Sequence, residues 1–120
     1  MAALTAASWT IVITDRKIEG ARRTTYGTLA IPGTDTYPND GIPLPDKGKF
    51  GFVRQFDGIV FFGVSPAAGT VAEYFTRYDK TNHKMFLYEE EAAAAGGPLL
   101  EADTGEVPGA RTWDFVAWGW

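Results

Sequence analysis

The chain has 120 residues, of which 45% are hydrophobic and 22% are charged, and these proportions exclude disorder along its whole length. Fifteen acidic residues against eleven basic ones give a formal net charge of −4, which excludes the broad basic surface that non-specific nucleic-acid binding requires. The absence of cysteine excludes disulfides, a thiolate nucleophile and a zinc knuckle. We expect one β domain over residues 9–120, a flexible arm over 1–8, and no membrane partner, since the longest strongly apolar stretch, 59–64, is too short to span a bilayer.

The first half of the chain predicts two strands followed by a long loop. Apolar and polar residues alternate over 9–14 and again over 24–31, which predicts two strands separated by the charged stretch 17–23. Residues 32–49 contain four prolines and three glycines, a composition typical of a long surface loop.

The middle of the chain predicts a β-hairpin. Asp57-Gly58 is a strong two-residue turn signal, and we expect it to join a strand over 50–56 to a strand over 59–64. The strand over 59–64 carries apolar residues on both faces. We therefore expect it to be central in its sheet or covered by a partner chain.

The remainder predicts four more strands. Two of them, at 71–78 and 84–88, are joined by a turn-rich connection, a short third lies at 99–102, and a last one lies at 111–118. Residues 89–95 have a helix-forming composition, but Gly96-Gly97-Pro98 follows directly, and we expect a loop or a single helical turn there.

About seven or eight short strands with little helix predict an all-β fold, either an antiparallel β-sandwich or a jelly-roll-like barrel. A parallel sheet would need intervening helices of ten or more residues, which the pattern does not contain. The strand alternation predicts a core formed by Ile11, Ile13, Leu29, Phe52, Ile59, Phe61, Phe75, Leu87, Trp113 and Phe115.

The chain carries no convincing catalytic or metal-binding motif. Ser65 lies in a near match to a nucleophile elbow, but Pro66 follows it and cannot donate the backbone N–H that an oxyanion hole needs. The single histidine, His83, falls in a predicted turn, where a solvated side chain is more common than a metal ligand. We therefore expect a protein that is not an enzyme and that uses no cofactor.

Two groups of residues have the composition of a contact surface. Arg16, Lys17, Arg22 and Arg23 form a basic cluster that suits an acidic surface on a partner protein. Trp118 and Trp120 have the opposite strand parity to Trp113, so they are expected to face away from the core, where tryptophan commonly marks an interface.

Several short motifs resemble a family of small virion proteins of tailed bacteriophages, the capsid decoration or cement proteins. The matching stretches are residues 17–20 (Lys-Ile-Glu-Gly), 37–44 (Tyr-Pro-Asn-Asp-Gly-Ile-Pro-Leu), 50–51 (Phe-Gly), 78–85 (Tyr-Asp-Lys-Thr-Asn-His-Lys-Met) and 117–119 (Ala-Trp-Gly). Together they are spread over about residues 17–119.

The resemblance implies a structural protein that binds the outer surface of an assembled phage capsid and stabilises it. Its partners would be the major capsid protein and copies of itself, in a trimer, and it would be made in the host cytoplasm and located on the capsid exterior. The side chains expected at the capsid or subunit interface are Arg16, Lys17, Arg22, Arg23, Tyr37, Pro38, Leu44, Trp118 and Trp120, with the arm over 1–8 ordering on the shell.

Two alternatives remain open from the sequence. One is another virion β-sandwich, such as a tail or head-completion protein. The other is a carbohydrate-binding module, in which Tyr37, Tyr74 and Tyr78 would stack on sugar rings.

Overall fold

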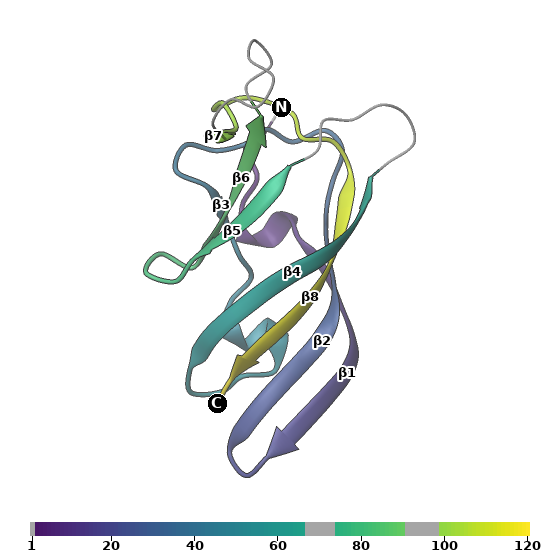
Figure 1. The fold of residues 1–120 in the computed structure, drawn as a ribbon, viewed down its shortest axis with the longest axis vertical. Helices are drawn as coiled ribbons and strands as arrows, with labels where there is room; N and C mark the ends of the chain where they lie inside the picture. Colours follow the sequence, from purple (N-terminus) through teal and green to yellow (C-terminus); the bar gives the residue numbers. More distant parts are fainter. Residues whose placement is uncertain (1, 67–73, 91–98) are drawn as a thin grey trace.

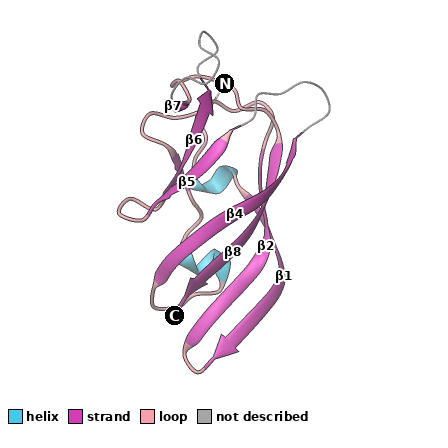
Figure 2. Ribbon diagram, viewed as in Figure 1, coloured by secondary structure: helices cyan, strands magenta, loops and turns pink. Residues whose placement is uncertain are grey.

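The computed structural model describes residues 2–66, 74–90 and 99–120, and within them the chain forms two antiparallel β-sheets packed as a sandwich (Figure 1). The strands are β1 (Thr10–Glu19), β2 (Arg22–Ile31), β3 (Ile42–Pro43), β4 (Phe56–Pro66), β5 (Phe75–Asp79), β6 (Lys84–Glu90), β7 (Leu99–Glu101) and β8 (Arg111–Gly119). In these ranges the helical elements are two short 3-10 turns, η1 (Ala6–Ser8) and η2 (Lys47–Phe50) (Figure 2). The predicted all-β sandwich is confirmed.

The larger sheet has the strand order β1-β2-β8-β4. Its two middle strands show the strict alternation that one buried face imposes: on β8, Trp113, Phe115 and Ala117 are buried, while the residues between them are half-buried or exposed. The outer face of this sheet points to solvent, so the predicted outward direction of Trp118 is confirmed.

The smaller sheet is centred on β6. On one edge β6 pairs with β5, and on the other it pairs first with β3 and then with β7. The core fills the space between the two sheets and consists of Leu4, Trp9, Leu29, Ile31, Tyr37, Ile42, Leu44, Phe50, Phe52, Ile59, Met85, Leu87, Ala102, Trp113, Phe115 and Ala117. Phe75, which the alternation placed in this core, is 58% exposed on the edge strand β5, so that prediction is wrong.

The segment ahead of β1 is part of the fold rather than a loose arm. Leu4 is 1% exposed, its backbone N–H donates to the Thr36 carbonyl, and the Thr36 N–H donates to the carbonyl of Ala2. The expectation of a flexible arm fails because one apolar side chain in an otherwise small-residue segment is enough to attach it to the core.

The predicted surface loop over residues 32–49 is exposed at both ends but contributes buried residues from its middle. Tyr37, Ile42 and Leu44 are core residues, and their backbone groups pair with other parts of the chain, for example Leu44 N–H with the His83 carbonyl. The middle of this proline- and glycine-rich segment can be buried because other segments of the chain satisfy its backbone hydrogen bonds.

Asp57-Gly58 is not a hairpin turn. Both residues lie inside β4, at a bulge where the pairing with β8 shifts between Phe56 and Gly58. Residues 50–55 form the end of η2 and a bend instead of the predicted strand. Of the two alternatives expected for 59–64, a central strand is wrong, since β4 is an edge strand in the order of its sheet, and coverage by a partner chain stays a prediction.

Two predictions fall partly outside the described residues. Of the strand expected over 71–78, the described part contains β5, and residues 71–73 lie outside it. Of the loop or single helical turn expected over 89–95, residues 89–90 belong to β6, and the rest lies outside the described residues.

Candidate functional site

The β1–β2 hairpin brings the basic cluster next to the C-terminal tryptophans. Glu19 and Arg22 face each other across a two-residue turn that begins with Gly20, whose φ of 64° suits glycine. Further along β2, Thr24 pairs with Trp118 on β8. Two groups nearly a hundred residues apart in sequence therefore share one end of the larger sheet, which we call the hairpin end: Lys17, Glu19, Arg22, Thr24, Trp118 and Trp120.

A surface hollow of about 370 Å³ occupies the outer face of the hairpin end and is lined by Lys17, Glu19, Arg22, Thr24 and Trp118. These residues meet because strand side chains alternate between faces: odd-numbered residues of β1 and even-numbered residues of β2 and β8 point outward here. Lys17, Thr24 and Trp118 follow one another across three neighbouring strands.

The Trp118 ring packs on Gly58 of the neighbouring edge strand. A Cβ atom added at Gly58 would lie 2.5 Å from the Cζ2 atom of the Trp118 ring, so a side chain at that position would displace the indole. Glycine at the bulge therefore leaves room for the Trp118 ring, and this ring forms one wall of the hollow.

The cations of the hollow lie near aromatic rings rather than carboxylates. The Lys17 Nζ atom lies 6.0 Å from the centre of the Tyr26 ring, and the Arg22 Cζ atom lies 5.9 Å from the centre of the Trp120 ring. Among the described residues, no carboxylate lies within ion-pair distance of either cation. Both positive charges remain available to a partner.

The other half of the basic cluster faces the opposite way. Arg23 donates from its Nη1 atom to the Gly51 carbonyl at 2.9 Å, and the Arg16 guanidinium packs beside Gly51. The Thr25 hydroxyl, fully buried, donates to the Phe50 carbonyl at 2.8 Å. These contacts attach the segment after η2 to the hairpin, so Arg16 and Arg23 support the site from behind.

The end of the chain is fixed to the same segment. The Trp120 carbonyl accepts the backbone N–H groups of Val53, Arg54 and Gln55 at 3.0, 2.8 and 3.2 Å, and the Trp120 N–H donates to the Gln55 carbonyl. This bonding holds the Trp120 ring near Arg22.

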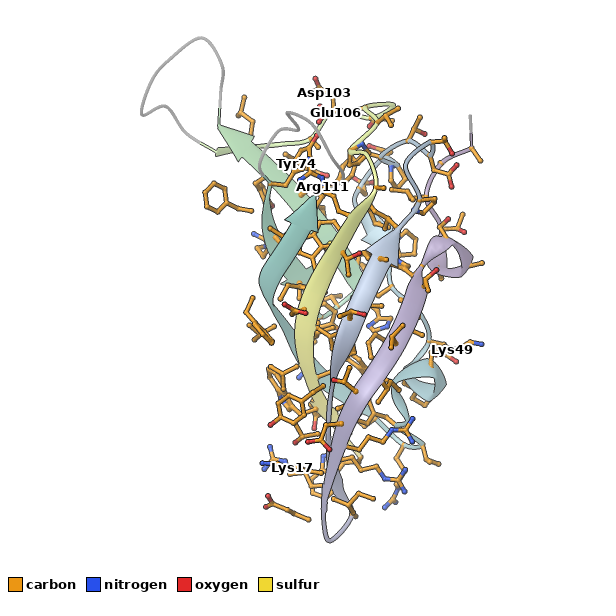
Figure 3. All side chains as sticks on the ribbon, turned by 90° about the vertical axis from the view of Figure 1, so that its right-hand side faces the viewer. Lys17, Lys49, Tyr74, Asp103, Glu106 and Arg111 are labelled. Atoms are coloured by element: carbon orange, nitrogen blue, oxygen red, sulfur yellow. The ribbon has the colours of Figure 1, made fainter. Side chains whose placement is uncertain are left out.

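Two segments of the chain are basic, and the rest of the chain is acidic. Residues 15–23 and 46–57 contain seven of the eleven basic residues but four of the fifteen acidic ones, a formal charge of +3 against −7 for the rest of the chain. The described structure is elongated, with extents of 50 × 29 × 24 Å, and Figure 3 places Lys17 at one end of the long axis and Asp103 and Glu106 at the other. The hairpin end is thus the basic end of an acidic protein.

Tyr37 and Leu44, which were expected at the interface, belong to the core instead. Their side chains are 1% and 3% exposed, and the Tyr37 hydroxyl donates to Glu101 Oε2 at 2.7 Å. Burial, and next this bond, raise the pKa of Tyr37 well above its usual range. We call this region the seam: residues 37–45 packed on residues 78–88. Pro38, within it, is half-buried.

His83 links the two parts of the seam. Its Nε2 atom lies 2.7 Å from the Pro45 carbonyl, which only accepts hydrogen bonds, so Nε2 carries a proton and donates. In the neutral ring Nδ1 then accepts the Tyr78 hydroxyl at 2.8 Å. Burial raises the pKa of Tyr78 to about 12, and the Asn82 side-chain amide holds the pKa of the neighbouring Asp79 below its usual value.

The three tyrosines that the carbohydrate-binding alternative requires are buried or make hydrogen bonds within the chain. The Tyr74 hydroxyl donates to Glu106 Oε2, and the Arg111 guanidinium lies 4.5 Å from the centre of the Tyr74 ring at the acidic end (Figure 3). Tyr37 is buried and Tyr78 bonds His83. The structure does not bring these three tyrosines together as a platform for sugars.

An apolar strip lies beside the hairpin end on the outer face of β4. Val60 and Phe62 are 48% and 67% exposed, and Val60 pairs with Val116 on β8. Val64 is also 49% exposed, but it follows a second bulge between Phe61 and Gly63 and pairs with the buried Trp113, so it is not on this face. The prediction that this strand is apolar on both faces holds, although the outward face is open rather than covered within the chain.

Sequence reasoning missed Glu19 and Thr24 as members of the site. Their strand parity could have found them, because both share the outward face with Lys17 and Trp118 once the hairpin register is known.

Within the described ranges, no group of three or more histidine, cysteine, aspartate or glutamate residues could hold a metal ion. Nor does any helix there have the length and apolar composition needed to cross a membrane. Comparison of the chain with protein-family models, curated proteins and solved structures gives no match.

Proposed function

We propose that this chain is a structural virion protein without enzymatic activity, which binds the outer surface of an assembled phage capsid and stabilises it. The observation that carries the proposal is the meeting of two motifs of the decoration-protein resemblance, residues 17–20 and 117–119, at the basic hairpin end beside an open hollow. The motifs at 37–44 and 78–85 meet in the seam, where they support the fold.

The charge distribution supports an oriented attachment. The basic hairpin end would face an acidic region of the major capsid protein, and the acidic end would face away from the shell. Complementary charge of this kind increases the association rate and selects one orientation.

Stabilisation of the shell would follow from mass action. A protein that binds the assembled shell and not its separate subunits lowers the free energy of the assembled state. The stabilisation increases with the ratio of the free protein concentration to the dissociation constant for the shell. Attachment at several neighbouring sites increases the effect through avidity.

Contacts between copies would complete the arrangement. We propose that neighbouring copies on the shell, in a trimer, cover the apolar strip of Val60 and Phe62, because an exposed apolar edge strand otherwise favours aggregation. This proposal concerns the particle, where the local concentration of copies is high.

The test uses purified protein and bare mature shells of its own virus. Co-sedimentation of the protein with shells and a higher shell melting temperature are the expected results. Failure to bind, or binding without a change in shell melting, would contradict the proposal. Binding to separated tails but not to heads would favour the alternative of a tail protein.

A further inference from the structure

We infer that the hollow of the hairpin end binds a carboxylate-bearing protein segment, with the carboxylate between Lys17 and Arg22 and an apolar side chain on the Trp118 ring. The inference rests on the proposed function in one respect, namely that the segment belongs to the shell. The ligand chemistry itself follows from the side chains of the hollow.

Charge is the first part of the argument. Lys17 and Arg22 contribute two positive charges, and Glu19, opposite Arg22 in the hairpin register, contributes one negative charge. Since neither cation has a carboxylate at ion-pair distance among the described residues, one more carboxylate would neutralise the hollow. Charge-assisted hydrogen bonds to a carboxylate are shorter and stronger than those to neutral groups.

Shape and preorganisation are the second part. The Trp118 indole packs on Gly58 and is half-buried, so it already offers an apolar wall to a ligand and has less rotamer freedom to lose than a fully exposed ring. The Arg22 guanidinium is held near the Trp120 ring, and that ring belongs to a residue tied by four backbone hydrogen bonds. A hollow of about 370 Å³ accommodates one or two side chains of a peptide rather than a folded domain.

The net positive charge of the hollow also favours an acidic protein segment over a neutral glycan as its ligand. A neutral sugar could stack on Trp118, but it would leave the net positive charge of the hollow without a counter-charge. An acidic segment supplies both the apolar contact and the charge. We therefore assign the hollow to the acidic segment and treat sugar binding as the contrary outcome.

The first experiment follows the four tryptophan indole N–H signals of the full chain by NMR, with the Trp118 signal assigned from the Trp118→Phe variant. The probes are N-acetyl-Phe-Glu-amide, its neutral counterpart N-acetyl-Phe-Gln-amide, and maltoheptaose. The acidic dipeptide is expected to shift the Trp118 signal and to bind about 10-fold more tightly than the neutral one. The difference should largely vanish in about 0.5 M salt.

The second experiment uses shells and two matched double variants. Lys17→Gln with Arg22→Gln removes both cations of the hollow but keeps part of their stems, whereas Lys80→Gln with Lys84→Gln removes the same charge from the β5–β6 hairpin. We expect the first variant to bind shells about 30-fold more weakly and the second to bind within about threefold of the unmodified chain. Equal melting temperatures of the free proteins would show that both variants fold.

The outcomes separate the inference from the proposed function. If the unmodified chain binds shells and the two double variants lose affinity equally, or not at all, the inference is wrong and the proposed function stands. If the unmodified chain does not bind shells but the acidic dipeptide selectively shifts Trp118, the proposed function is wrong and the ligand chemistry stands. Equal binding of the neutral dipeptide, or a comparable shift with maltoheptaose, overturns the inference.

Discussion

The seam and the hairpin end are built from the same kind of sequence and have opposite roles. Each contains short, turn-rich motifs with glycine, charged residues and an aromatic residue. In the seam several aromatic and aliphatic side chains belong to the core, with Tyr37 and Leu44 nearly inaccessible. At the hairpin end the side chains of Lys17, Arg22 and Trp118 line an open hollow.

The difference arises from what each backbone pairs with. Within the seam, residues 37–45 lie against β6, and their N–H and carbonyl groups find partners in two other segments, so their side chains can be buried at little cost. The hairpin arms pair with each other, and Ile18 near their tip is 64% exposed. A motif of turn residues alone therefore does not predict whether its side chains will be buried or exposed.

The largest expected effect is on the seam. Leu44→Ala should lower the free energy of unfolding by about 2–5 kcal/mol, because it removes a buried side chain and leaves a cavity. Ile18→Ala, a similar truncation in an exposed position at the hairpin end, should change it by less than about 0.5 kcal/mol. Urea denaturation of both variants measures the contrast, and similar losses would remove the distinction between the regions.

Features of these regions that depend on local alternation along one strand could be predicted from the sequence. The last strand was expected over 111–118 and is observed over Arg111–Gly119, with Trp113 and Phe115 inside and Trp118 outside, because alternation is a local signal. The basic cluster and Trp118 were both recognised, but their meeting depends on the register of three strands.

What could not be predicted depends on contacts between distant residues. Asp57-Gly58 has the local signature of a turn, yet Gly58 serves a cross-strand contact with a tryptophan sixty residues later. The burial of Leu44 likewise depends on β6 and His83, which no pattern within 32–49 contains. Local propensity was overruled by pairing in both cases.

A smaller loss is expected when one hydroxyl is removed from the seam. Tyr37→Phe takes away the donor to Glu101 and the acceptor of the Leu87 N–H, and should cost about 1–3 kcal/mol. Tyr26→Phe, on the outer face near the hairpin end, is the matched control and should cost less than about 0.5 kcal/mol. Equal costs in urea denaturation would contradict the assignment of Tyr37 to a satisfied core network.

Alkaline pH should weaken the seam before the hairpin end. The pKa of Tyr78 is raised to about 12 in the folded chain, above the value of about 10 in an unfolded one, so its contribution is complete below pH of about 10 and is lost as the pH rises toward 12. Because Tyr78 is partly exposed, screening by solvent reduces the contribution of its raised pKa to the free energy of unfolding to about 1 kcal/mol. The free energy of unfolding, measured from pH 9 to pH 12, should therefore fall, and the fall should be shallower in Tyr78→Phe; equal slopes in both proteins would contradict it.

The smallest effect on stability is expected on the apolar strip next to the hairpin end. Phe62→Ser should change the free energy of unfolding by less than about 0.5 kcal/mol, because the side chain is 67% exposed. Phe61→Ser is the matched control: its side chain packs against the core from the adjacent position of β4, and its removal should cost about 2–4 kcal/mol.

The Phe62→Ser variant also tests whether the apolar strip is covered by neighbouring copies on the particle. If neighbouring copies cover Phe62, Phe62→Ser should weaken the cooperativity of shell binding while leaving the affinity of an isolated copy at low occupancy unchanged, because the hollow lies elsewhere on the sheet. Co-sedimentation across a range of occupancies measures both quantities. Unchanged cooperativity would show that the copies do not meet through this strip. A loss of affinity already at the lowest occupancy would instead show that the strip contacts the shell itself, so that attachment extends from the hairpin end along β4.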